Sequence, residues 1–143
     1  MFKTLAILIA ALATPLAFAQ THEVKMLNRG ERGSMVFEPD FLDIAVGDSV
    51  KFIATHSSHN AASILGMVPE GAATFKGRIN EEIEVTFDVP GVYGLECTPH
   101  RAMGMVMLIR VGGTDMAAPA IPEALPTRAK QRLDAIVQRE FDH

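Results

Sequence analysis

One short segment gathers most of the soft metal-binding side chains of this chain. Residues 95–105 read LECTPHRAMGM and contain Cys97, the only cysteine in 143 residues, followed by His100, Met103 and Met105. A single thiol cannot form a disulfide within the chain. A thiolate, an imidazole and a thioether together suit copper, whereas zinc, iron–sulfur clusters, calcium and magnesium prefer other donor sets. The segment therefore predicts a copper site.

Such a site also needs a second imidazole from elsewhere in the chain. The segment THSSHN at residues 55–60 offers His56 and His59, whereas His22 and His143 are weaker candidates close to the termini of the mature chain. Spacing alone leaves the choice between His56 and His59 open. It also leaves open which methionine supplies the thioether: Met103, Met105 or Met107.

The elements that must position these ligands are predicted to be strands. Residues 82–89 (EIEVTFDV) alternate polar and apolar side chains without a fault, and residues 49–55 behave similarly. Residues 91–97 predict a strand that ends at Cys97, and residues 105–111 predict a strand that is apolar throughout and more fully buried. Turns rich in Gly and Pro separate these runs, which is typical of an all-β sandwich or barrel. The loop at residues 98–104 then lies at one end of it.

The N-terminal segment predicts export. Residues 1–19 (MFKTLAILIAALATPLAFA) contain a lysine, an apolar run and a small-x-small motif, so we expect a signal peptide cleaved after Ala19. The apolar run is interrupted at Thr14 and Pro15 and is short for a bilayer span. We therefore expect no membrane insertion once the signal is removed.

The rest of the chain is expected to hold one sandwich and a tail. Residues 20–113 form the predicted β-sandwich, and residues 114–143 form a C-terminal helical extension packed on it. Apolar residues at helical spacing over 127–141 predict the helix, with Thr127 as its cap. The net charge is −4 and no basic run is present, which excludes a nucleic-acid-binding function.

The copper segment also resembles a known family. Residues 97–105 (CTPHRAMGM) match the C-x2-H-x4-M loop of the pseudoazurins, a branch of the cupredoxin family of type I (blue) copper proteins. Shorter matches at residues 26–28, 35–39, 59–60 and 69–71 follow in the same order, and the helical tail also fits. The resemblance implies a Greek-key β-sandwich of about eight strands with C-terminal helices.

The resemblance further implies the roles of individual residues around one copper ion. The ligands are expected to be His59, Cys97, His100 and the axial Met105, which selects among the candidates left open above. Supporting roles fall to three neighbours. Asn60 is expected to tie the ligand loops together, Pro99 to remove an N–H near the sulfur, and Met35 to lie beside the exposed histidine.

The function implied by the resemblance is periplasmic electron transfer without catalysis. A monomer is expected to carry single electrons between redox proteins such as a copper nitrite reductase or a c-type cytochrome, through transient contacts. The main alternative is a periplasmic copper chaperone or storage protein, because the chain has eight methionines, although most of them are dispersed. The family's lysine ring is thinned here, and Glu96 directly precedes Cys97. The remaining candidates for partner docking are Arg29, Lys76, Arg78, Arg101 and Met103.

Overall fold

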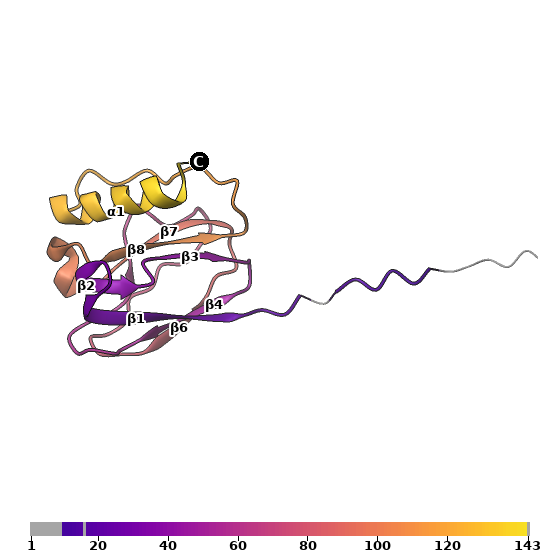
Figure 1. Cartoon of the computed structure of the whole chain (residues 1–143), viewed down its shortest axis with the longest axis horizontal. Helices are drawn as coiled ribbons and strands as arrows, with labels where there is room; N and C mark the ends of the chain where they lie inside the picture. Colours follow the sequence, from indigo (N-terminus) through magenta and orange to yellow (C-terminus); the bar gives the residue numbers. More distant parts are fainter. Residues whose placement is uncertain (1–9, 16, 143) are drawn as a thin grey trace, which may run out of the picture.

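The computed structural model describes residues 10–15 and 17–142. The predicted signal peptide therefore lies partly outside the described residues, at residues 1–9 and 16. Residues 10–15 and 17–19 extend away from the rest of the molecule, exposed and without regular secondary structure (Figure 1). No helix in the described part of the chain is both long enough and apolar enough to cross a membrane.

Two four-stranded sheets face each other (Figure 1). The first has the order β2-β1-β4-β6 and comprises β2 (Gly33–Glu38), β1 (Thr21–Gly30), β4 (Ser49–Ile53) and β6 (Ile83–Thr86). The second has the order β3-β8-β7-β5 and comprises β3 (Phe41–Ile44), β8 (Val106–Val111), β7 (Gly91–Glu96) and β5 (Ala62–Ser63). The β1–β4 and β3–β8 pairs are parallel, and the other pairs are antiparallel. The predicted all-β sandwich of about eight strands is confirmed.

The C-terminal helix explains why β8 is apolar throughout. Helix α1 (Thr127–Glu140) packs over the sheet that contains β8 and β7 (Figure 1). Alternate residues of β8 join the core between the sheets, and the intervening residues join a second core under the helix. Leu133 and Ile136 of α1 are almost fully buried in this second core, together with Val106 and Leu108. Each such side chain contributes roughly 1.5–3 kcal/mol of burial free energy.

The start of α1 differs from the prediction. The helix begins at Thr127 as expected, but the residue at its N-cap is Pro126, and no side chain caps the first turn. Pro126 has φ −56° and ψ 147°, an extended conformation that its ring fixes at φ. Thr127 therefore already belongs to the first turn, and its predicted capping role is wrong.

A buried arginine fastens the other end of α1 to the sandwich. Arg110 of β8 donates to Asp43 of β3 over 2.7 Å and to the backbone carbonyl oxygen of Glu140 over 3.3 Å. Its guanidinium also lies 5.2 Å and 4.8 Å from the ring centroids of Phe41 and Phe141. Because the charge is paired and covered by aromatic rings, its burial at 6% exposure is compensated.

Candidate metal centre

The Cys97 segment is a short helical turn between two paired strands. Residues Thr98–Met103 form a 3-10 helix, η1, where the sequence predicted a loop, and Gly104 ends it with φ +82°. The Cys97 N–H donates to the Met105 carbonyl oxygen over 3.0 Å, and the Met105 N–H donates to the His100 carbonyl oxygen over 3.2 Å. The β7–β8 ladder thus continues past Glu96 and holds three expected ligands at the end of the sandwich.

Three donor atoms from two distant segments converge at this end. The Cys97 sulfur lies 3.7 Å from Nδ1 of His59 and 3.4 Å from Nδ1 of His100, and the two Nδ1 atoms are 3.1 Å apart. Cys97 and His59 are fully buried, and His100 is half-buried. A soft thiolate with two imidazoles in a compact, largely buried triangle fits copper, and the described residues contain only this cysteine.

Backbone geometry distinguishes Met105 from the other candidate methionines. Met105 is fully buried in the same core cluster as Cys97, and its backbone bonds to both Cys97 and His100. Met103 belongs to the turn itself and is 47% exposed. Met107 is also buried but lies further along β8. The methionine that closes the loop is therefore Met105.

Asn28 fixes the orientation of His59, a role that the sequence analysis did not assign. The His59 Nε2–H donates to Oδ1 of Asn28 over 2.8 Å, which leaves the Nδ1 lone pair facing the sulfur. Burial lowers the pKa of His59 and so favours the neutral ring that a metal ligand requires. His56 points elsewhere, because its Nδ1 accepts the Asn28 N–H over 2.8 Å.

Asn60 joins the two ligand segments through its side chain. Its Nδ2 donates to the Gly77 carbonyl oxygen over 3.0 Å and to the Thr98 hydroxyl over 3.1 Å, and its Oδ1 accepts the Thr98 N–H over 2.7 Å. The residue is 1% exposed. The two bonds to Thr98 tie the residue after His59 to the residue after Cys97, and the third bond holds the Asn60 amide against Gly77.

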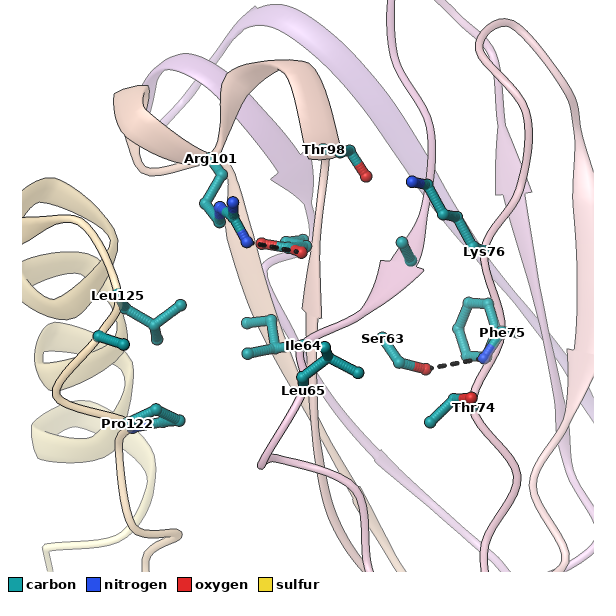
Figure 2. A pocket seen from close by; sticks show the side chains of 13 residues that line it. Ser63, Ile64, Leu65, Thr74, Phe75, Lys76, Thr98, Arg101, Pro122 and Leu125 are labelled. Atoms are coloured by element: carbon teal, nitrogen blue, oxygen red, sulfur yellow. Dashed lines mark hydrogen bonds and ion pairs between the residues drawn. The ribbon is translucent and has the colours of Figure 1, made fainter.

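Glu96 is buried in the structure rather than displayed on the surface. It is 7% exposed, its Oε1 lies 3.4 Å from Arg101, and its Oε2 has no hydrogen-bond partner among the described residues. Burial raises the pKa of Glu96, and Arg101 opposes that rise. A cavity of about 550 Å³ lies beside it, lined by Lys76, Thr98 and Arg101 (Figure 2). The carboxylate of Glu96 therefore reduces the positive charge of the molecular surface less than its position next to Cys97 in the sequence suggests.

The other predicted docking residues lie at different places around the turn. Lys76 and Arg78 line a cavity of about 450 Å³ together with Pro99 and Ile79, and the Ile79 side chain is 48% exposed. Arg29 is exposed at the end of β1 and does not line this cavity. The structure thus brings Lys76 and Arg78 together with the turn that carries His100.

The four expected ligands supply two imidazoles, a thiolate and a thioether, which is the donor set of a blue copper site. Backbone bonds position Cys97, His100 and Met105, and the Asn28 side chain orients His59. When copper is bound, it supplies one-electron chemistry between Cu(I) and Cu(II). The chain contributes three buried ligands, His59, Cys97 and Met105, and the half-buried His100.

Comparison with known proteins shows that the chain is similar to copper-binding proteins. A family model described as copper binding proteins, plastocyanin/azurin family, matches residues 24–112. Pseudoazurin of Paracoccus pantotrophus is 48% identical over 126 residues, which covers 87% of this chain and 86% of the relative. A putative pseudoazurin of Rhizobium leguminosarum bv. viciae is 49% identical over 131 residues, or 91% and 85% of the two chains.

A solved structure agrees with these sequence matches. Pseudoazurin from Methylobacterium extorquens AM1 superposes with a TM-score of 0.74 at 37% identity, covering 83% of this chain and 98% of its own. The expected copper ligands His59, Cys97, His100 and Met105 are confirmed by this family match together with the donor geometry. The chain therefore belongs to the pseudoazurins of the plastocyanin/azurin family, which are non-enzymatic electron carriers with one type I copper site.

Proposed function

We propose that this electron carrier works in the periplasm, after removal of residues 1–19. The observation that supports this proposal is that Leu12 and Phe18 are 94% and 82% exposed, so the described residues 10–15 and 17–19 add nothing to the core. The Gln20 N–H, in contrast, donates to Asp48 over 2.9 Å, directly before β1. Residues 20–113 and 114–143 then act together, because α1 shares a core with β8.

The intact mass of the protein recovered from a periplasmic extract tests this proposal. We expect a chain that starts at Gln20, because the cleavage motif ends at Ala19. Full-length protein in the membrane fraction would instead mean that the segment serves as an anchor.

The redox partners are proposed to dock at the end of the sandwich that carries His100. Lys76 and Arg78 flank an apolar hollow that includes Ile79 and Pro99, and they are exposed. Met103, exposed on the same turn as His100, adds apolar surface. A few cations around an apolar centre favour a short-lived complex with a redox protein whose docking surface has an acidic rim. We propose that this partner is a copper nitrite reductase or a c-type cytochrome.

Charge reversal at Lys76 tests this docking surface. We expect Lys76→Glu to slow reduction of a copper nitrite reductase or a c-type cytochrome by about 3–10-fold at low salt, because it replaces attraction by repulsion. Stopped-flow absorbance gives the second-order rate at several ionic strengths. Lys25→Glu is the matched control, since Lys25 is exposed on the outer side of β1. Equal slowing by both variants would mean that docking depends only on net charge.

A further inference from the structure

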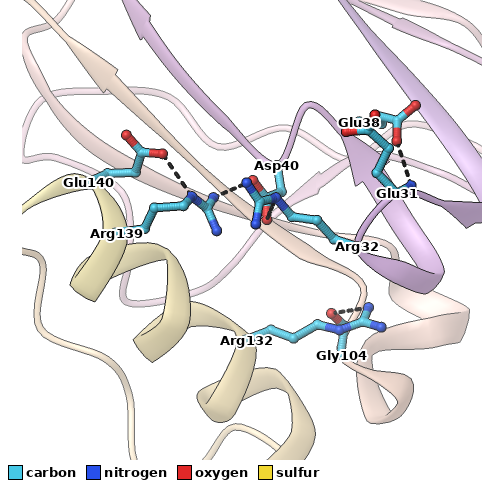
Figure 3. A network of polar contacts seen from close by, with 8 residues as sticks. All are labelled: Glu31, Arg32, Glu38, Asp40, Gly104, Arg132, Arg139 and Glu140. Atoms are coloured by element: carbon cyan, nitrogen blue, oxygen red, sulfur yellow. Dashed lines mark hydrogen bonds and ion pairs between the residues drawn. The ribbon is translucent and has the colours of Figure 1, made fainter.

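A guanidinium from the C-terminal helix reaches the copper turn. The Nη1 of Arg132 donates to the carbonyl oxygens of Gly104 over 2.9 Å and Met35 over 2.6 Å, and its Nη2 donates to the carbonyl oxygen of Ser34 over 2.6 Å. Figure 3 shows the Arg132 side chain extending from α1 to Gly104. Because Gly104 directly precedes Met105, one side chain links the helix, strand β2 and the axial ligand's backbone.

The two carbonyl groups that share Nη1 belong to residues with left-handed backbone conformations. Met35 has φ +52°, which is uncommon for a residue with a side chain, and Gly104 has φ +82°. Such conformations persist where surrounding contacts determine them. The hydrogen bonds from Arg132 orient both carbonyl groups and therefore stabilise both conformations together.

Helix α1 also approaches Gly104 too closely for any larger residue. A Cβ atom at Gly104 would lie 2.8 Å from Cγ of Arg128 and 2.9 Å from Cδ of Arg132. The aliphatic parts of both arginine side chains therefore pack closely against Gly104, the residue that precedes Met105. The contact between the helix and the copper turn is thus tight as well as hydrogen-bonded.

The hydrogen bonds that the Arg132 guanidinium donates all go to the backbone carbonyl oxygens of Ser34, Met35 and Gly104. Arg139, on the same helix, pairs with Asp40 and Glu140, whereas no ion pair involves Arg132 among the described residues (Figure 3). The planar fork of arginine can serve three acceptors in fixed directions, which the point charge of lysine cannot do.

We propose that Arg132 is a positioning residue of the copper centre. It holds the Gly104–Met105 segment against Met35 and so fixes the axial thioether relative to His59, Cys97 and His100. Because the axial ligand tunes the potential of such sites, α1 controls the electronic properties of a centre to which it contributes no ligand.

Spectra of copper-loaded variants test this role. We expect both Arg132→Lys and Arg132→Met to change the intensity ratio of the two visible thiolate-to-copper bands and to shift the reduction potential. The matched control is Arg139→Met, which removes an anchor of the same helix far from the turn. It should lower the melting temperature and leave the band ratio and the potential at their wild-type values.

Hydrogen exchange in the metal-free proteins provides a second readout. We expect the Met105 amide to exchange about tenfold faster in Arg132→Met, the factor that loss of one net hydrogen bond gives, and at the wild-type rate in Arg139→Met. Wild-type spectra and exchange in both Arg132 variants would overturn the proposal. A second contrary result is possible. If Arg132→Lys kept the wild-type spectra and potential while Arg132→Met shifted only the potential, the charge of the side chain rather than its positioning role would matter, and the proposal would be overturned. If Arg132→Met does not fold, the spectra and exchange of Arg132→Lys decide.

Discussion

Replacement of Cys97 by serine is expected to abolish the intense visible absorption of the copper-loaded protein while the sandwich stays folded. The absorption requires a thiolate bound to Cu(II), and a serine hydroxyl is neither soft nor ionised at neutral pH. Serine is nearly isosteric, so the Cys97 N–H keeps its bond to the Met105 carbonyl oxygen. Visible and electron paramagnetic spectra measure the loss, and far-ultraviolet circular dichroism measures the fold.

Met103→Ala is the matched control for Cys97→Ser. Met103 belongs to the same turn, but it is 47% exposed whereas Cys97, His59 and Met105 are fully buried, so its removal should preserve the colour. Survival of the intense band in Cys97→Ser would contradict the ligand assignment. A changed reduction potential in Met103→Ala would mean that the axial ligand is misassigned, because the axial ligand tunes the potential.

Asn60→Ala is expected to destabilise the protein by roughly 2–5 kcal/mol, because it removes three hydrogen bonds and leaves buried partners unsatisfied. The lost partners are the Thr98 N–H, the Thr98 hydroxyl and the Gly77 carbonyl oxygen. Since the two bonds to Thr98 join the segment of His59 to that of Cys97, the variant should also bind copper more weakly. Urea unfolding of the metal-free protein gives the free energy, and copper titration gives the affinity.

Thr98→Val provides a graded comparison with Asn60→Ala. It removes only the hydroxyl that accepts from Asn60 and retains the Thr98 N–H, so we expect a loss of about 1 kcal/mol. If Asn60→Ala cost no more than Thr98→Val, the amide would be a replaceable contact rather than the link between the ligand segments.

The fold class and the soft donor set could be predicted from the sequence because their signals are local, whereas the choices of His59 and Met105 came from the family resemblance. Three of the four ligands lie within residues 97–105, and a strand before a short turn is enough to bring them together. The alternation along residues 82–89 reflects a strand with one face exposed. The uniform apolar run at residues 105–111 reflects a strand that is buried on both faces. The helical spacing over 127–141 predicted α1 for the same reason.

Long-range contacts decided what the residue pattern left open. His59 lies 38 positions before Cys97, and the residues alone could not separate it from His56, a choice that the family resemblance made and the Asn28 bond explains. The start of α1, in contrast, was decided locally: Pro126 occupies the N-cap position, so Thr127 belongs to the first turn.

The sequence by itself therefore determined a soft copper site on a β-sandwich with a helical tail, because residue type and short spacing encode donor chemistry and local periodicity. Only the tertiary structure decided that Glu96 is buried beside Arg101 and that Arg132 holds the backbone before Met105. Arg132 and Gly104 are 28 positions apart, and Arg132 and Ser34 are 98 apart. No periodic pattern links residues so distant, since their proximity results from the packing of α1 on the finished sandwich.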